Sequence, residues 1–211
     1  MADFLEAVDS DSGKKEPTPV TLVSAGAEVG TAGNPLPIAA GAGENFIGKV
    51  GGTTARVTAS FTRPADTTQY ASGDLVANST TAGSVTPMEF TVARVAVGSG
   101  MIRRARIRKW GTSVTSASFR LHLYSASPTV SNGDNGAWLS NQAANYIGAI
   151  DVTVDKAFTD GAAGNGIPQI GSDINFKLDS GQKVYGLLEA RGAYTPISGE
   201  QFSIALEVLQ D

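Results

Sequence analysis

The chain of 211 residues contains no cysteine, which excludes a disulfide framework and a metal site built on thiolates. It contains one histidine, His122, and any Ser–His–Asp site would have to use it. Neither a G-x-S-x-G nucleophile elbow nor a G-x-x-x-x-G-K-S/T phosphate loop occurs in the sequence. We therefore expect a structural or surface role for His122, no catalytic residue, no cofactor and no metal. The protein is predicted not to be an enzyme.

Long apolar runs are also lacking. A helix that spans a membrane needs about 18 consecutive apolar residues, and no run approaches that length. The N-terminal stretch MADFLEAVDSDSGKKEP is acidic and lacks the basic-then-apolar order of a signal peptide. We expect an intracellular product with no membrane partner.

Positive charge is in deficit over the whole chain. There are 16 Lys and Arg residues against 20 Asp and Glu, which gives a formal net charge of −4. Proteins dedicated to nucleic acid usually have the opposite balance, so no nucleic-acid partner is expected. The local exception is GMIRRARIRKW, Gly100–Trp110, which contains five of the sixteen cations.

The alternation of a strand would place Arg104, Arg106 and Arg108 of this run on one face, as a basic ridge with a spacing of about 6.5–7 Å. The residues expected on the opposite face are Arg103, Ala105, Ile107 and Lys109, with Ala105 and Ile107 over the core. The ridge has two main interpretations: a solvated face that is partly paired with neighbouring carboxylates, or a docking surface for an acidic protein or a sister subunit. Nucleic acid is disfavoured because no aromatic ladder accompanies the arginines.

Residues 1–54 differ from the rest in composition. Phe4, Leu5 and Val8 fall at helical spacing, and the stretch 18–54 is rich in Gly, Ala, Pro and Thr. Ordering a chain costs roughly 1–2 kcal/mol per residue, and so little apolar surface cannot offset that cost alone. We predict an extended N-terminal arm that serves attachment or assembly. Its candidate contact residues are Phe4, Leu5, Val8, Leu36, Ile38 and Phe46.

Residues 55–211 alternate between short β-type runs and clusters of turn residues, with no convincing helix. About eight or nine strands in such a length predict an all-β domain, an antiparallel β-sandwich that is jelly-roll-like. Two runs alternate cleanly. The residues expected to face inward in them are Phe119, Leu121 and Leu123, and Phe202, Ile204, Leu206 and Val208.

The segment RPADTTQY, residues 63–70, predicts a structured loop. Pro64 favours an extended Arg63 and so ends the preceding strand. Asp66 and Thr67 are expected to bond nearby backbone N–H groups, and Tyr70 to hold the loop by its ring. The alternative is that Arg63 or Asp66 contacts a neighbouring subunit.

Weaker candidates for a site remain. Asp134 and Asp160 lie in glycine-rich loops that could suit Ca²⁺, but Asn-Gly and Asp-Gly pairs serve turns far more often. Aromatic residues could form a platform for a sugar, although core or interface packing is the favoured interpretation. These aromatic residues are Trp110, Tyr124, Trp138, Tyr146, Tyr185 and Tyr194.

The runs FTRPADTTQYASGDLVANSTTAGSVTP, GMIRRARIRKWGTSVTSASFRLHLYSASPTVSNGDNGAW, YIGAIDVTVDKAFTDGAAG and GLLEARGAYTPISGEQFSIALEVLQ resemble a family of tailed-bacteriophage and prophage structural proteins. The resemblance covers roughly residues 58–211, and RPADTTQYASGD is its most specific piece. It implies a virion component that is assembled in the cytoplasm of a host bacterium.

Within such a virion, the favoured role is that of a capsid decoration (cement) protein. The expected partners are the major capsid protein and neighbouring copies of the chain, in a dimer or trimer. One alternative is a tail, baseplate or head-fibre component that binds a host glycan. Another is a sandwich-fold carbohydrate-active enzyme, which would need two carboxylates about 5–10 Å apart in a cleft.

Overall fold

The computed structural model describes residues 52–111, 116–139, 145–169 and 173–211, together with the backbone of four two-residue strands closer to the N-terminus. The chain divides into two units, Met1–Gly48 and Lys49–Asp211. The first strand of the second unit begins at Thr53, two residues before the expected start of the sandwich. No helix occurs among the described residues, and so none that could cross a membrane.

In the first unit, β1 (Ala7–Val8) pairs with β2 (Lys15–Glu16), and β3 (Val23–Ser24) pairs with β4 (Ala27–Glu28). The backbone at Val8 is therefore extended rather than helical. The predicted contact residues of the arm, which are Phe4, Leu5, Leu36, Ile38, Phe46 and the side chain of Val8, lie outside the described residues. Their role stays a prediction.

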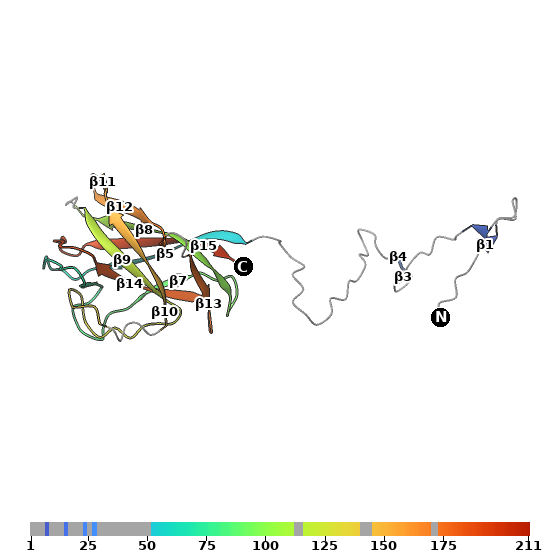
Figure 1. Ribbon diagram of the computed structural model, residues 1–211, viewed down its shortest axis with the longest axis horizontal. Coiled ribbons are helices and arrows are strands. Elements are labelled where there is room, and N and C mark those ends of the chain that lie inside the picture. The colour runs from blue at the N-terminus through green and yellow to red at the C-terminus, as the bar shows by residue number, and fades with distance from the viewer. Residues whose placement is uncertain are drawn as a thin grey trace. The chain divides into compact units, whose positions relative to one another are not determined.

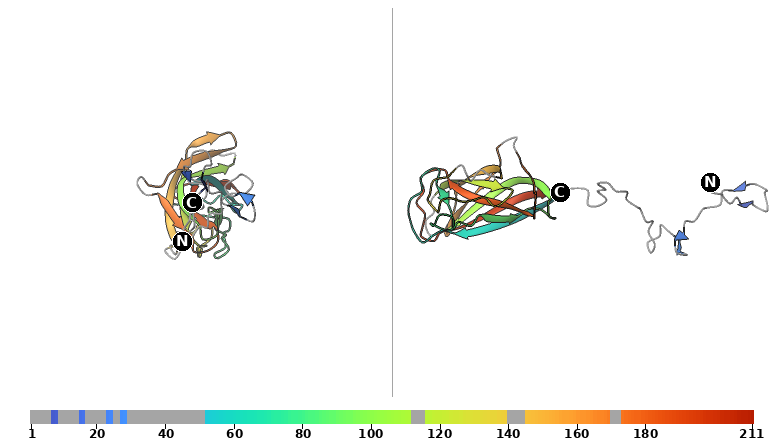
Figure 2. Two further views of the ribbon diagram at one scale, coloured as in Figure 1. Left: turned by 90° about the vertical axis from the view of Figure 1, so that its right-hand side faces the viewer. Right: turned by 90° about the horizontal axis from the view of Figure 1, so that it is seen from below.

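The second unit is an antiparallel sandwich of two sheets, as predicted, and Figures 1 and 2 show its layers. The β9 sheet contains β10 (Tyr146–Val154), β9 (Ala117–Tyr124), β14 (Lys183–Ala190), β6 (Leu75–Val76) and β7 (Met88–Thr91). The β8 sheet contains β11 (Lys156–Phe158), β12 (Gly161–Gly166), β8 (Ser99–Trp110), β15 (Gln201–Gln210), β5 (Thr53–Thr62) and β13 (Ile174–Lys177).

The connections between the sheets follow jelly-roll topology. The eight principal strands in chain order are β5, β7, β8, β9, β10, β12, β14 and β15. Numbered 1 to 8, they lie in the order 1-8-3-6 in the β8 sheet and 2-7-4-5 in the β9 sheet. Long connections therefore cross repeatedly from one sheet to the other, which joins the two layers into one unit.

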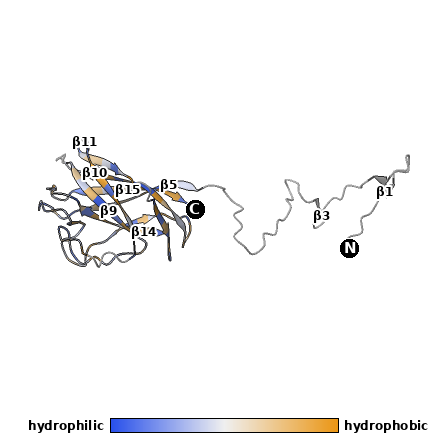
Figure 3. Cartoon of the chain, viewed as in Figure 1, coloured by the Kyte–Doolittle hydropathy of each residue, from blue (hydrophilic) through white to orange (hydrophobic). Residues whose placement is uncertain are grey.

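The core lies between the sheets and follows the predicted alternation. In Figure 3 apolar and polar residues share the same strands, as a sheet with one buried face requires. The rings of Phe119 (β9) and Phe202 (β15) pack edge to face, with their centroids 5.4 Å apart. All residues predicted to face inward on these two strands are buried: Phe119, Leu121, Leu123, Phe202, Ile204, Leu206 and Val208.

One prediction for the basic run is wrong. Arg103 is exposed, whereas plain alternation placed it inward. The pairing of β8 with β15 shifts between Glu207, which lies opposite Arg104, and Val208, which lies opposite Ile102. This β-bulge inserts Arg103 as an extra residue. Because of it, the strand keeps apolar side chains over the core on both sides of the bulge.

Strand β12 was not expected, because the segment TDGAAGNGIP, residues 159–168, has the composition of a turn. The glycines of β12 have a specific reason. A Cβ atom at Gly164 would overlap the carbonyl oxygen of Thr153, and one at Gly166 would overlap that of Asp151. Both carbonyls belong to β10 of the other sheet, so glycine permits the backbones of the two sheets to meet along this side.

This close approach predicts that Gly164→Ala destabilises the sandwich. The obstructing atoms are backbone, so we expect the free energy of unfolding to fall by about 1–3 kcal/mol, as in overpacked cores. Gly192→Ala is the matched control, because nothing lies within 4 Å of its added methyl group. Urea titration of both variants measures the difference. Equal stability of the two variants would contradict the role given to Gly164.

Candidate interaction face on the β8 sheet

The basic run forms a ridge on the outer face of β8. Arg104, Arg106 and Arg108 are exposed, as the alternation predicts, while Ala105 and Ile107 between them are fully buried. The backbone thus fixes three guanidinium groups on one side of one strand. Their use in an interface stays a prediction.

Small side chains surround the ridge. Arg106 lies opposite Ala205 of β15 on one side and Asn165 of β12 on the other. Because both neighbours are small, they leave the side chain of Arg106 exposed. An open hollow of about 250 Å³ results. It is lined by Arg56, Arg104, Arg106, Asn165, Ala205 and Glu207.

The hollow has an excess of positive charge. Its three guanidinium groups and one carboxylate give a formal charge of +2. Arg104 Nε lies 3.5 Å from Glu207 Oε2, and both side chains are exposed. Exposed pairs of this kind contribute about 0–1 kcal/mol. Across residues 52–111, 116–139, 145–169 and 173–211, no carboxylate lies within ion-pair distance of Arg56 or Arg106.

Arg108 differs from the other two arginines of the ridge. Its guanidinium lies 4.5 Å from the centre of the Trp110 ring, and Nη2 is 3.7 Å from Asp160 Oδ2. The interpretation as a solvated, partly paired face thus holds for Arg108 and in part for Arg104. Arg56 and Arg106 supply donors in a planar fork, which suits carboxylate or phosphate oxygens. We call the exposed set Arg56, Arg104, Arg106 and Arg108 the basic face.

Lys109, the fifth cation of the run, is too deeply buried to contact a binding partner. Lys109 faces inward, as predicted, and is 1 % exposed. Its Nζ donates to Glu200 Oε1 at 2.9 Å and to the hydroxyl of Tyr194 at 3.2 Å. The Tyr194 hydroxyl also donates to Glu200. A buried ammonium group requires such compensation, since burial removes its hydration.

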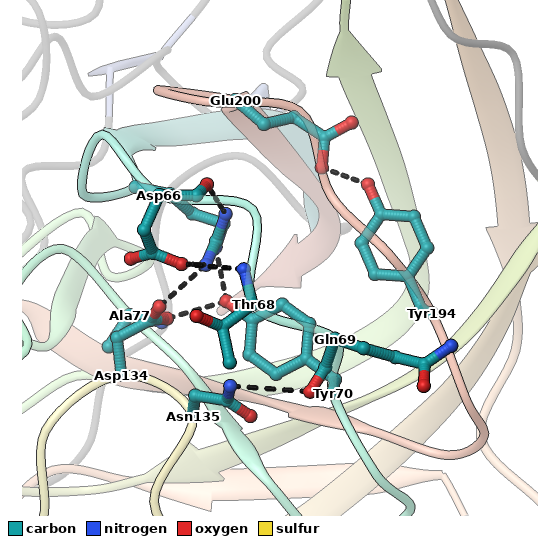
Figure 4. Close-up of polar contacts among 10 residues, drawn as sticks. Asp66, Thr68, Gln69, Tyr70, Ala77, Asp134, Asn135, Tyr194 and Glu200 are labelled. Atoms are coloured by element: carbon teal, nitrogen blue, oxygen red, sulfur yellow. Dashed lines mark hydrogen bonds and ion pairs between the residues drawn. The ribbon is translucent and has the colours of Figure 1, made fainter.

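A second buried ion pair fixes the RPADTTQY loop. Arg63 is 2 % exposed, and its Nη2 donates to Asp134 Oδ2 at 2.7 Å. The Tyr70 hydroxyl and the Ala77 N–H donate to Asp134 Oδ1 at 2.6 and 2.7 Å. Figure 4 shows Tyr70 and Ala77 beside Asp134. The structural interpretation of Arg63 therefore holds, and burial excludes a contact between Arg63 and another subunit in this conformation.

The other loop residues agree in part with expectation. Asp66 Oδ1 accepts the predicted backbone bond, from Thr68 N–H at 3.0 Å. Thr67 makes no side-chain hydrogen bond within the described part of the chain. Both oxygens of Asp134 are used by protein donors. Among the described residues no group of three His, Asp or Glu side chains could hold a metal.

The two buried ion pairs are joined by stacked tyrosines. The rings of Tyr70 and Tyr194 lie 6.0 Å apart with an angle of 2° between their planes. Burial, with the neighbouring carboxylates, raises the pKa of both hydroxyl groups far above the usual value of 10. Both therefore remain neutral donors at any physiological pH. We call Arg63, Tyr70, Asp134, Lys109, Tyr194 and Glu200 the tyrosine network.

His122 lies on the outer face of the β9 sheet. Its ring stacks on Trp138 with centroids 4.1 Å apart, and Nε2 lies 2.7 Å from Glu189 Oε2. Burial lowers the pKa of His122 below 6.5, an effect that outweighs the opposing influence of Glu189. No serine or threonine hydroxyl among the described residues bonds to His122. Its contacts are those of a packed structural residue.

Comparison of the chain with protein-family models, with curated proteins and with solved structures gives no match.

The tyrosine network predicts a large cost for Asp134→Ala. Arg63 would stay buried without its carboxylate, so we expect a loss of about 3–5 kcal/mol in the free energy of unfolding. Asp160→Ala is the control, because Asp160 is exposed and its change should cost about 0.5 kcal/mol or less. Chemical denaturation of both variants tests the difference. A small loss for Asp134→Ala would show that the buried pair does not hold the loops.

The lowered pKa of His122 predicts a pH-dependent stability. The unfolded chain binds a proton near pH 6.5, whereas the folded protein binds it only at lower pH. Stability from this group is therefore complete above about pH 6.5 and is lost as the pH falls through the folded-state value. His122→Gln retains a donor for Glu189 without titrating. Urea midpoints between pH 8 and pH 5, about the range in which histidine titrates, should decline more for the wild type, and parallel curves would refute this.

Proposed function

We propose that the protein is a structural component of a tailed-bacteriophage virion, a capsid decoration (cement) protein. In this proposal it binds the outside of the head through its basic face and stabilises adjacent capsomers. The partner surfaces are acidic patches on the major capsid protein or on a neighbouring copy of the chain. The protein acts as a clamp and performs no chemistry.

The observation that carries the proposal is the exposed basic face of an acidic protein. Arg56 and Arg106 lack a carboxylate partner among the described residues, and Glu207 pairs only loosely with Arg104. An incoming carboxylate could take bidentate bonds here without first breaking a strong internal pair. Repeated copies on a lattice would then reinforce one another, so each contact need only be modest.

Two further points support this function. The jelly-roll connectivity recurs in viral capsid proteins and in lectin domains, although a fold alone does not determine function. The resemblance of residues 58–211 to phage structural proteins indicates the same class. The tyrosine network also fits a clamp, because it holds loops of both sheets in a fixed arrangement that needs no partner to form.

Charge reversal of the ridge tests the proposal. Each arginine paired bidentately with a carboxylate would contribute on the order of 1–3 kcal/mol. The double variant Arg104→Glu, Arg106→Glu should therefore lose most of its occupancy on purified heads, while its thermal unfolding stays near that of the wild type. High salt should mimic the reversal only in part if the contact is partly buried. Quantitative mass spectrometry of purified particles measures the occupancy.

The control variant is Arg94→Glu, Lys177→Glu. It makes the same change in net charge at two exposed cations outside the basic face, and no carboxylate in the described part of the chain pairs with either residue. Normal occupancy of the control with loss in the test variant supports docking through the ridge. Normal occupancy of both would show that the arginines form only a solvated face. Few copies near the tail, rather than many on the head, would refute the cement role.

A further inference from the structure

A second concavity lies away from the basic face. This pocket of about 620 Å³ opens between β10, the outer strand of the β9 sheet, and residues that follow β12 or lie at the start of β13. Its volume falls in the range of small-ligand sites, about 300–1,000 Å³. The side chains used below are those of Arg120, Tyr146, Asp151, Ile167, Gln169 and Asp173, all of which line it.

The pocket lies beside a gap in the pairing along one edge of β8. Pairing of β12 with β8 ends at Gly166, opposite Ala105, and pairing of β13 starts at Ile174, opposite Ile102. The bulged Arg103 lies between these positions. Gly166 is also the last residue of β12, and a Cβ atom there would overlap the Asp151 carbonyl of β10. From Asp151 toward Tyr146, β10 is an edge strand, with every second residue directing its N–H and C=O groups away from β9.

An aromatic ring stands at this edge. Tyr146 is 46 % exposed, although its ring lies 5.8 Å from those of both Tyr124 and His122. These neighbours fix the position of the ring without covering it. Ile167, another lining residue, is 60 % exposed. The pocket therefore offers apolar surface that is already positioned for a ligand.

Some polar groups of the pocket are held in place by hydrogen bonds, and several still have atoms that could bond to a ligand. Arg120 binds Asp151 through two hydrogen bonds, Nε to Oδ1 at 2.7 Å and Nη2 to Oδ2 at 2.8 Å. The pair leaves Nη1 without an acceptor among the described residues, and Asp151 remains largely exposed. The side chains of Gln169 and Asp173 make no hydrogen bond within the same part of the chain.

We propose that this pocket binds a neutral saccharide. Hydroxyl groups both donate and accept, so a polyol can use guanidinium, carboxylate and amide groups together, while the faces of sugar rings pack against aromatic and aliphatic surface. Two carboxylates against one guanidinium disfavour an anion. The bulge between Tyr146 and Gly148 interrupts the edge and disfavours an added peptide strand.

The inference is independent of the capsid role. The pocket shares no lining residue with the basic face, so either property can fail without the other. It also does not require hydrolysis. The Arg120 guanidinium lowers the pKa of Asp151, which therefore remains an acceptor at neutral pH rather than a proton donor.

The test is a titration of the ¹⁵N-labelled full-length protein with maltotriose, cellotriose and tri-N-acetylchitotriose, up to millimolar concentrations and with EDTA present. We expect saturable amide shifts, centred on Tyr146–Asp151, Gln169 and Asp173, with at least one of the three sugars. Tyr146→Ala should weaken binding roughly tenfold or more, the factor that corresponds to about 1.4 kcal/mol. The matched control is Phe158→Ala, an exposed ring outside the pocket.

The possible results separate clearly. Loss of binding in Tyr146→Ala, with binding retained in Phe158→Ala and in the double arginine variant, supports the saccharide pocket. Absence of saturable shifts with all three sugars overturns it, as do shifts that persist in Tyr146→Ala. Tyr146 is half exposed, so we expect Tyr146→Ala to fold. A dispersed amide spectrum of the variant verifies this.

Discussion

Two ion pairs buried beside a pair of stacked tyrosines constrain the arrangement of the loops. Arg63 follows β5 and Asp134 lies between β9 and β10, whereas Lys109 is in β8 and Glu200 precedes β15. Removal of one partner from either pair would leave a buried charge uncompensated and lower the free energy of unfolding by several kcal/mol. Apolar residues of similar volume often replace a buried ion pair without loss of stability, but they would not require these particular loops to meet. The network therefore specifies an arrangement more than it adds net stability.

The same backbone rules produce two unlike surfaces. From Arg104 to Arg108 the alternation along β8 directs every second residue, an arginine, outward, which yields an open hollow with an excess of positive charge. Near the bulged Arg103 the partner of β8 changes from β12 to β13, and residues between these two strands line the pocket with mixed polar groups beside β10. One surface suits repeated anionic contacts and the other a small neutral ligand.

Much of the fold could be predicted because its signal is local. The alternation of apolar residues around Phe119 and Phe202 needs only the period of a strand, and it also directs the arginine ridge outward. Strand β12 had no local signal in the sequence. Its glycines are required by a close contact with the backbone of β10, which exists only in the folded chain. The partnership of Arg63 with Asp134 joins residues far apart in the sequence. Lys109 gave a partial signal, since a cation at an inward position requires a buried carboxylate.

The pairing of β15 with β5 gives the sandwich two different ends. Thr53, where the chain enters the first strand, lies opposite Gln210, near the last residue, and Figure 1 shows the C-terminus beside the start of β5. Arg63 and the tyrosine network follow the other end of β5. A domain fused after Asp211 would emerge beside the entry point of the chain, a strand length away from the network. Within the second unit, the end of the β5–β15 pair that holds Thr53 and Gln210 is thus better suited to genetic fusion than the end that holds the buried ion pairs.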